Sequence, residues 1–265
     1  MAMEIKAIPT LKGKEAEHFV KAADKAYKNQ NKQDFSKHVL EARAVLKKAK
    51  MLENIGFLFE KCTFAVLDEY TIKECDPFSC GHQDLDDFFH NDAPLYNAQL
   101  LGKSYCFRSD KKPSDIVCAF TVSNDSIRVN ILPNSREKKV QKAIPRAKQM
   151  RRYPGVLIGR LGINKEYKHQ GIGSDLMTFI KSWFIDAGNK TGCRFLIVDA
   201  YNENIPLNYY LKNGFKYLFS TEAQEVEYTG FETGTHLKTR LMYFDLIDIM
   251  PYPNNSSKDS INGNY

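Results

Sequence analysis

The spacing of hydrophobic residues separates a helical front part of the chain from a longer, strand-rich part. Apolar side chains recur at helical spacing from Ala16 to Tyr27 and again from Phe35 to Leu46, with a polar run between the two stripes. This pattern predicts a helical hairpin over residues 1–52. Each predicted helix has one narrow apolar face, which is too little for an independent core, so we expect this segment to dock on another surface.

From Cys62 onwards, runs rich in Val, Ile, Phe and Tyr predict β-strands that alternate with helical stretches. Strands are expected at residues 63–71, 104–108, 115–123, 155–163, 194–199, 215–220 and 240–249. Helices are expected at 83–101 with a break at Pro94, at 171–188 and at 206–213, and residues 133–152 are expected to form a loop or short helix. The Pro-, Asn- and Ser-rich end is expected to be disordered. The chain therefore divides into a helical N-terminal extension at 1–52, an α/β domain at 53–250 and a tail at 251–265.

Glycines mark the central strand and the turn that follows it. Three of them interrupt the apolar run Gly155–Ile163, which is typical of a bulge or a close backbone approach. The next segment, Lys168-His-Gln-Gly-Ile-Gly173, lies where a strand gives way to a helix, and N–H groups at a helix start favour an anion such as phosphate. Taken alone, a Gly-x-Gly step is more often a tight turn. The longer glycine patterns of nucleotide-triphosphate loops and dinucleotide-binding domains are missing.

Two motifs about 40 residues apart resemble the GNAT acetyltransferase superfamily. In that family a buried strand is followed by Gln/Arg-x-x-Gly-x-Gly/Ala and a long helix, and here the motif is Lys168–Gly173. Farther on, Asn208-Tyr-Tyr-Leu-Lys-Asn-Gly-Phe215 resembles the last helix of the family, with Tyr210 four residues before the Gly-Phe step. The resemblance covers roughly residues 56–250. The sequence departs from the family at Lys168, which replaces Gln or Arg, and at Glu203, where the family often has Asn.

The resemblance implies an α/β fold with a central, mixed but mostly antiparallel, split seven-stranded sheet flanked by helices. It also implies transfer of an acetyl group from acetyl-CoA to a primary amine. In this interpretation Tyr210 protonates the departing thiolate, because a tyrosine with a free pKa of about 10 remains a proton donor at neutral pH. The expected cofactor-binding residues are the strand edge for the pantetheine arm and the pyrophosphate turn, namely Leu161, Gly162, Ile163, Lys168, His169, Gln170, Gly171, Ile172, Gly173 and Ser174. A backbone N–H near Ile163 is expected to stabilise the oxyanion.

The front half of the domain resembles the toxin branch of this superfamily. The matching segments are Phe78–Phe89, Asp92-Ala93 and Gly102–Tyr105. In that branch the acceptor is the α-amino group of an aminoacyl-tRNA, and a neighbouring antitoxin restrains the toxin. An α-amino group with a pKa near 8 is partly neutral already, so no dedicated base is required. Glu166, Asp199 and His169 are candidate bases, although each is more simply explained as an exposed or structural residue.

A basic stretch lies just before the central strand and contains a single acid, Glu137. It is the best candidate for contact with the tRNA backbone, through Arg136, Lys138, Lys139, Lys142, Arg146, Lys148, Arg151 and Arg152. The alternative is a solubilising loop, because Tyr153 is the only nearby aromatic residue for base stacking. Contacts to phosphate without base readout fit this composition.

The N-terminal extension and the α/β domain also differ in net charge. Residues 1–50 contain 12 Lys or Arg and 6 Asp or Glu, which is the whole excess behind the net charge of +6. The basic, two-helix character of this segment resembles the small antitoxin-like proteins encoded beside such toxins, so it is expected to restrain the enzyme. A docking extension without a regulatory role is the alternative.

The cysteine and hydrophobic patterns argue against a disulfide-stabilised, metal-binding or membrane-spanning protein. The six cysteines are scattered through apolar runs, which indicates reduced thiols, and the spacing of Cys75, Cys80, His82 and His90 matches no common zinc pattern, so no metal is expected. No apolar run approaches the roughly 20 residues of a membrane span and no signal peptide is evident, so we expect a cytoplasmic protein without a membrane partner. A small-molecule or protein N-acetyltransferase, and a non-catalytic coenzyme A-binding regulatory protein, remain alternatives. The sequence leaves open whether the chain forms a homodimer.

Overall fold

The computed structural model describes residue 21 and residues 56–145, 150–186, 188–189 and 191–250. The predicted hairpin at 1–52 and the predicted tail at 251–265 lie outside the described residues, except for Lys21, which is exposed and helical. The chain divides into two compact units, Met1–Phe35 and Ser36–Tyr265. Every described residue other than Lys21 belongs to the second unit.

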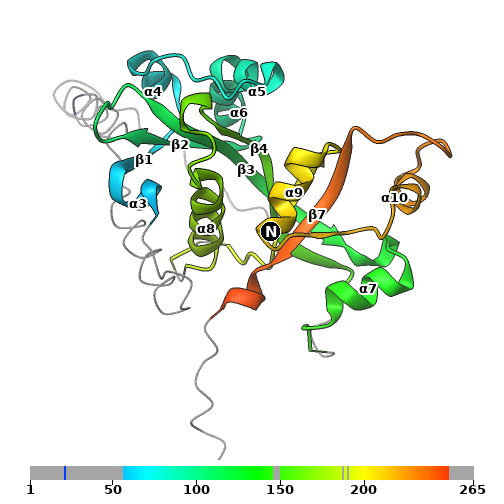
Figure 1. The fold of residues 1–265 in the computed structure, drawn as a ribbon. Helices are drawn as coiled ribbons and strands as arrows, with labels where there is room; N and C mark the ends of the chain where they lie inside the picture. Colours follow the sequence, from blue (N-terminus) through cyan, green and yellow to red (C-terminus); the bar gives the residue numbers. More distant parts are fainter. Residues whose placement is uncertain (1–20, 22–55, 146–149, 187, 190, 251–265) are drawn as a thin grey trace, which may run out of the picture. The chain divides into compact units, whose positions relative to one another are not determined.

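A seven-stranded sheet forms the centre of this unit in the described residues (Figure 1). The strands run in the order β1-β2-β3-β4-β5-β7-β6, and every neighbouring pair is antiparallel except β4 and β5. Their bounds are β1 (Cys62–Val66), β2 (Lys103–Ser109), β3 (Ile116–Arg128), β4 (Arg152–Ile163), β5 (Phe195–Tyr201), β6 (Lys216–Tyr217) and β7 (Thr239–Asp245). This mixed, mostly antiparallel sheet confirms the expected fold class.

Helices flank the sheet on both faces. The α-helices are α3 (Phe57–Lys61), α4 (Glu69–Glu74), α5 (Gln83–Asp87), α6 (Ala93–Ala98), α7 (Asn134–Gln141), α8 (Ile172–Phe184), α9 (Asn204–Lys212) and α10 (Glu222–Thr229). A π-helix, η1 (Phe88–Asp92), joins α5 to α6, and short 3-10 turns are η2 (Val129–Ile131), η4 (Lys165–Tyr167) and η5 (Leu246–Ile249). Within the described residues, no helix has the length and hydrophobicity needed to cross a bilayer.

The first face of the sheet is covered by α3, α8 and α9. Alternate residues of a strand point to opposite faces, and Tyr105 and Phe107 of β2 point towards α8. There the Phe179 ring lies 4.9 Å from the Phe107 ring, and the Trp183 ring lies 4.9 Å from the Tyr105 ring. Aromatic packing of this kind fixes α8 on the sheet, so the turn at its N-terminus has a defined position.

The second face of the sheet is covered by α4 to α7. Under α4 to α6 a buried cluster includes Phe78, Phe89 and Cys106. Under α7 another cluster joins Val140 of the helix to Ile197 of β5. Residues of β5 that alternate with Ile197, including Asp199, therefore point to this same face.

The sheet splits between β4 and β5. Their parallel ladder consists of three residue pairs, from Gly155 with Phe195 to Leu157 with Ile197. Beyond Leu157, β4 continues with β3 as its partner, while β5 continues with β7. A bulge in β4 adds to the divergence of β4 from β5. Thr121 of β3 pairs with Arg160 and Val122 pairs with Ile158, so Gly159 has no partner in this ladder. This is the bulge that the strand glycines predict.

Several predicted bounds were wrong. The strand expected at 63–71 ends at Val66, because the Asp68 carboxylate accepts a hydrogen bond from the Thr71 N–H at 2.8 Å and starts α4. The break expected at Pro94 occurs earlier, at η1, and Pro94 lies in the first turn of α6, where proline is tolerated. The last strand ends at Asp245, whose carboxylate accepts from the Ile247 N–H and starts η5.

Candidate active site

The split leaves one edge of β4 without a strand partner. Leu161, Gly162 and Ile163 pair with β3 along their other edge. Their free edge faces the opening between β4 and β5, since the β4–β5 ladder stops at Leu157. A strand edge offers alternating N–H and C=O groups, which suits an extended, amide-containing arm such as pantetheine.

The turn from η4 into α8 brings the predicted pyrophosphate-binding residues together. Lys168, His169, Gln170 and Gly171 are all exposed, and α8 begins at Ile172. Gly171 has a φ of +79°, a left-handed conformation that glycine adopts without strain, and it forms the N-cap of α8. Among the described residues the N–H groups of Ile172 and Gly173 have no acceptor, so they are available to an anion, whereas the Ser174 N–H donates to the Gly171 carbonyl at 3.0 Å. The exposed Lys168 precedes this turn, and its ammonium lies towards the segment before α5, 3.8 Å from where a Cβ on Gly81 would be.

The neighbouring helix α9 requires a glycine at position 173. A Cβ atom at this position would lie 2.9 Å from the Tyr209 ring, closer than real Cβ contacts. The Tyr209 hydroxyl donates a 2.7 Å hydrogen bond to the Gly173 carbonyl. This contact attaches α9 to the first turn of α8. The residues present thus fit a coenzyme A pyrophosphate, because two free N–H donors and two glycines, Gly171 and Gly173, meet at one turn.

Tyr210 follows Tyr209 on α9 and has a buried ring. It is 9% exposed, and its ring lies 5.0 Å from the Tyr209 ring and 5.3 Å from the Phe215 ring. Among the described residues its hydroxyl has no hydrogen-bond partner. Burial raises the pKa of Tyr210 above that of a free tyrosine, so the hydroxyl carries its proton throughout the neutral range.

Asp199 lies on the second face of the sheet, on the part of β5 that has left β4. Its side chain is exposed and forms no hydrogen bond or ion pair with any described residue. The surrounding protein partly desolvates the carboxyl group and raises the pKa of Asp199, the carboxylates of Asp125 and Glu225 raise it further, and Arg160 lowers it. Its position beyond the last β4–β5 pair could be seen only in the fold.

The segment before α5 closes over the same region. A Cβ on Gly162 would lie 3.2 Å from Cys80 and from the Phe78 ring, so these residues cover the predicted cofactor-binding strand. The Tyr201 hydroxyl donates a 2.7 Å hydrogen bond to Asp84, and the His82 ring stacks on Tyr201 at 4.8 Å. These contacts join α5 to the end of β5.

Arg160, at the bulge, is not among the site residues predicted from the sequence. Its guanidinium lies 5.1 Å from the centre of the Phe88 ring and donates to the Gly159 carbonyl. Its position beside Asp199 depends on the fold. A charged residue inside an otherwise apolar strand was the signal available in the sequence.

The basic stretch is only partly a surface. Arg136 is buried, and its guanidinium donates to the carbonyls of Leu218, at 2.6 Å, and Tyr217. Its expected role in nucleic-acid contact is therefore corrected to a structural one. Arg146 and Lys148 lie outside the described residues. The exposed members, together with Arg128, which pairs with Arg152 across the ladder, form what we call the α7 basic surface: Arg128, Lys138, Lys139, Lys142, Arg151 and Arg152.

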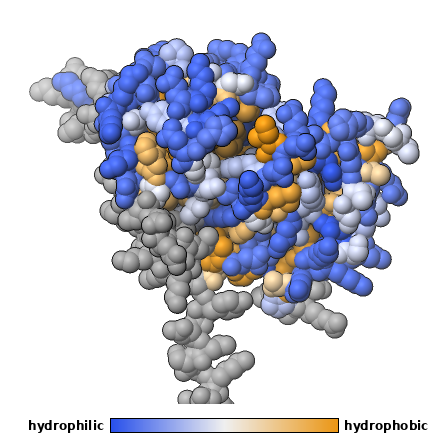
Figure 2. Space-filling model, in the orientation of Figure 1, coloured by the Kyte–Doolittle hydropathy of each residue, from blue (hydrophilic) through white to orange (hydrophobic). Residues whose placement is uncertain are grey.

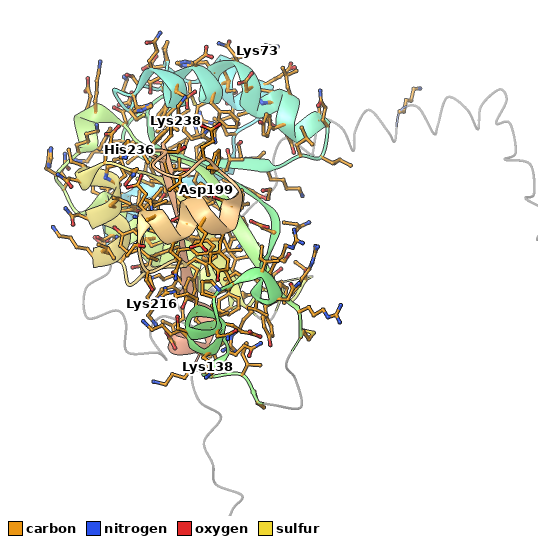
Figure 3. All side chains as sticks on the ribbon, turned by 90° about the vertical axis from the view of Figure 1, so that its right-hand side faces the viewer. Lys73, Lys138, Asp199, Lys216, His236 and Lys238 are labelled. Carbon is orange, nitrogen blue, oxygen red and sulfur yellow. The ribbon has the colours of Figure 1, made fainter. Side chains whose placement is uncertain are left out.

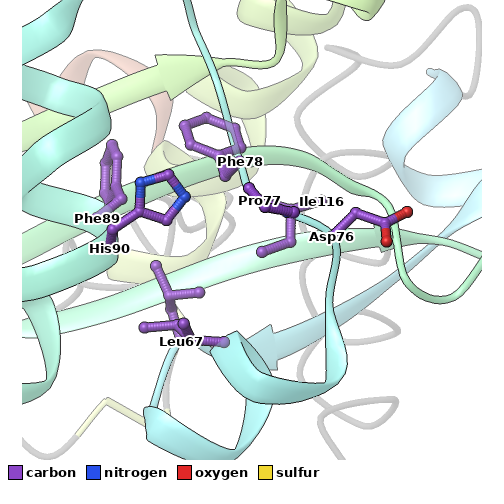
Figure 4. A pocket seen from close by; sticks show the side chains of 8 residues that line it. Leu67, Asp76, Pro77, Phe78, Phe89, His90 and Ile116 are labelled. Carbon is purple, nitrogen blue, oxygen red and sulfur yellow. The ribbon is translucent and has the colours of Figure 1, made fainter.

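A separate small pocket lies beneath α4 and η1 (Figure 4). It is lined mainly by apolar side chains, among them Leu67, Phe78 and Ile116, with His90 at one side. None of the predicted cofactor-binding residues lines it. Elsewhere, Figure 2 shows a largely hydrophilic surface on which hydrophobic residues gather around α9, where Ile205 and Leu211 are exposed. In the described residues no group of three or more His, Cys, Asp or Glu is arranged to hold a metal ion.

Comparisons with known proteins agree with the split-sheet geometry. Residues 136–217 match the family model described as an acetyltransferase (GNAT) domain. No curated protein matches the chain in sequence.

Solved structures resemble the chain at low identity. AtaT complexed with acetyl-methionyl-tRNAfMet has 20% identity and a TM-score of 0.50, and the match covers 71% of this chain and 96% of that chain. A tyrosine-to-phenylalanine mutant of KacT has 19% identity and a TM-score of 0.49, with coverage of 72% and 98%. At this identity the likeness to AtaT shows the fold alone. The family model identifies the function class of the part that it matches: residues 136–217 belong to a GNAT acetyltransferase domain, an enzyme domain whose family uses acetyl-CoA.

Proposed function

We propose that the protein transfers an acetyl group from acetyl-CoA to the α-amino group of an aminoacyl-tRNA. The observation that carries the choice of acceptor is the α7 basic surface, which is exposed and unneutralised. Among the described residues no carboxylate forms an ion pair with any of its six cations. Such a surface favours a polyanion over a small amine or a neutral peptide. AtaT, which has a similar fold, forms a complex with acetyl-methionyl-tRNAfMet.

The α7 basic surface and Asp199 are on the same side of the sheet. Val140 of α7 packs in one cluster with Ile197, and Asp199 lies two residues farther along β5 on the same face. In Figure 3, α7 with Lys138 lies below Asp199. A tRNA held through its phosphates by α7 can therefore direct its aminoacyl end towards the split from this face.

The cofactor side of the reaction takes place on the opposite face. Acetyl-CoA, when bound, supplies the acetyl group as a thioester. The first turn of α8 and Lys168 hold the pyrophosphate, and the free edge at Leu161, Gly162 and Ile163 holds the arm. A backbone N–H near Ile163 stabilises charge on the carbonyl oxygen, an effect worth ~3 to 4 kcal/mol per donor. The Tyr210 hydroxyl donates its proton to the departing thiolate.

The acceptor side needs a neutral amine. An α-ammonium group that reaches the split meets the unpaired Asp199 carboxylate, which accepts a proton from it and leaves the nitrogen lone pair free to attack. The positive charge of Arg160 lowers the pKa of Asp199 and so favours its ionised form. Each face of the sheet then has one proton-transfer group at the split, Tyr210 on the first face and Asp199 on the second.

The direct test offers labelled acetyl-CoA to total charged tRNA, with uncharged tRNA, polyamines and a peptide panel in parallel. We expect label on charged tRNA alone. Tyr210→Phe should lower kcat by about 100-fold or more with acetyl-CoA affinity retained, since a general acid contributes about 10²- to 10⁴-fold. Label on polyamines or peptides alone would contradict the proposed acceptor. Absence of turnover with intact acetyl-CoA binding would instead indicate a coenzyme A-binding regulatory protein.

A charge-reversal variant tests the α7 basic surface separately. Lys138→Glu, Lys139→Glu and Arg152→Glu combined should abolish acetylation of charged tRNA while acetylation of a small amine continues. The matched control changes three exposed lysines outside the α7 basic surface, Lys61→Glu, Lys73→Glu and Lys111→Glu, for the same change in net charge. Equal losses in both variants would show that only overall charge matters.

A further inference from the structure

Lys181 is a buried lysine with no acidic partner. It lies in α8 nine residues after the helix start and is 7% exposed. Among the described residues no carboxylate forms an ion pair with it. Burial lowers the pKa of Lys181 to about 8. A buried ammonium without a counter-ion lowers the stability of the fold, so its presence calls for a role.

The ammonium of Lys181 contacts the C-terminal end of α9, the residue before β6 and strand β7. Its ammonium donates a 2.5 Å hydrogen bond to the carbonyl of Asn213, the C-cap residue of α9. It also lies 3.8 Å from the centre of the Phe244 ring and 6.0 Å from that of Phe215. A cation is favourable at a helix C-terminus, where the carbonyls carry partial negative charge, and over an aromatic ring.

This end of α9 is the turn that carries Tyr210. The Phe215 N–H donates to the Tyr210 carbonyl at 3.0 Å, and the Asn213 N–H donates to the same carbonyl at 3.1 Å. Helix α9 is thus attached to α8 at two points, through Tyr209 to Gly173 and through Asn213 to Lys181. The first contact reaches the pyrophosphate turn, and the second sets the position of the turn beneath Tyr210.

We propose that Lys181 is a positioning residue for Tyr210, whose charged ammonium holds the C-terminal turn of α9 against α8. The inference rests on the proposed function, in which Tyr210 is the proton donor. Lys181 itself touches neither acetyl-CoA nor the acceptor in this scheme. Its loss should therefore affect the chemical step and spare cofactor binding.

The test replaces the ammonium by a side chain of similar length, Lys181→Met, with Lys181→Gln as a second, polar variant. Because small misplacements of a reacting group are costly, we expect kcat to fall about 10- to 100-fold. The KM for acetyl-CoA should stay within about twofold. The melting temperature should be unchanged or higher, because the buried charge is gone. Lys216→Met, which removes an exposed lysine of β6, is the matched control and should retain normal kcat.

A double-mutant cycle separates positioning from general damage. In a Tyr210→Phe background, Lys181→Met should have little further effect on kcat, because the group that it positions has lost its proton. Equal fold-losses in both backgrounds would overturn the proposal, and so would a melting temperature that falls in proportion to activity in both Lys181 variants.

Amide hydrogen exchange gives a readout that does not depend on turnover. Loss of the ammonium should speed exchange at the Phe215 amide, which bonds to Tyr210, relative to amides in the middle of the sheet. Unchanged exchange at Phe215 would refute the tether even if no acceptor were acetylated. Failure of the proposed function would appear differently, as absence of label transfer by the unmodified protein to any amine.

Discussion

Asp199 and Tyr210 lie on opposite faces of one sheet, and partial or full desolvation favours the protonated form of both. For Tyr210 this form is the useful one, since a proton donor must hold its proton until the thiolate leaves. For Asp199 the protonated form is the inactive one. The same surroundings that prepare the carboxylate to take a proton also make its ionisation unfavourable to folding.

This conflict predicts that Asp199→Asn stabilises the protein while it impairs the reaction. The pKa of Asp199 is raised in the folded state, so ionisation of this carboxyl group destabilises the fold. The loss of stability is complete above the folded-state pKa and vanishes below the unfolded-state pKa of about 4. We expect a higher melting temperature for the variant at pH 7 and no difference near pH 4. The kcat/KM of the variant should be lower than that of the parent, and its pH–rate profile should no longer fall on the acidic side.

Thermal melts across this pH range and a pH–rate profile check both halves of the prediction. Glu60→Gln, at an exposed position of α3, provides the control. A variant that is less stable than the parent at pH 7 would show that Asp199 has a favourable partner in the fold.

Local structure that follows from neighbours in sequence could be predicted. Lys168 to Ser174 lie at the expected turn into a helix, and Tyr210 lies on the helix before the Gly-Phe step. Their roles in binding and catalysis stay predictions. Arg136 was misassigned because its burial depends on carbonyls about 80 residues away. The surroundings of Asp199 and Lys181 could not be predicted for the same reason, since only the packed sheet shows them.

At the scale of elements, the contact between α8 and α9 couples cofactor binding to the position of the proton donor. Gly173 is part of the pyrophosphate turn and also the surface on which Tyr209 packs. A change at this glycine should therefore act on both helices at once.

Gly173→Ala is expected to raise the KM for acetyl-CoA and to lower stability by about 1 to 3 kcal/mol, because a methyl group would overlap the Tyr209 ring. Gly192→Ala is a suitable comparison, since a Cβ there meets no atom within 4 Å. Calorimetric titration with coenzyme A and thermal melts measure the two effects. If the Gly173 variant bound coenzyme A as tightly as the wild type, the Tyr209 ring would have to move aside without weakening the binding site.

The elements that the sequence predicted well were those with a long apolar pattern. Helix α8 and strands β2 and β4 were expected close to their observed positions, because each has a buried stripe or run. The region from Leu67 to Glu74 was predicted as strand, and the capping carboxylate of Asp68 makes it a helix. The strand at Phe215 shortened to β6, because Leu218 and Phe219 turn into the cluster under α7.

At the scale of the whole molecule, the basic N-terminal extension remains a proposed restraint on the enzyme. Removal of residues 1–52 leaves every described residue of the acetyltransferase domain in place. We expect the truncated protein to acetylate charged tRNA faster than the full chain, as an enzyme freed from an antitoxin-like segment would.

Initial rates of the two proteins at equal concentration provide the measurement, and adding the excised segment as a peptide should restore inhibition. Equal rates in a folded truncation would assign the extension to docking alone.

The three residue pairs that join β4 to β5 have a mechanical meaning beyond the opening that they create. The sheet consists of two blocks, β1 to β4 and β5 to β7, with a seam that has far fewer ladder bonds than either block. Such a seam is the natural fracture line for partial unfolding. In the proposed complex acetyl-CoA bonds to β4 and α8 on one side of the seam and meets Tyr210 of α9, the helix that packs on β5, on the other. Bound cofactor would therefore hold the two blocks together and raise the stability of the protein.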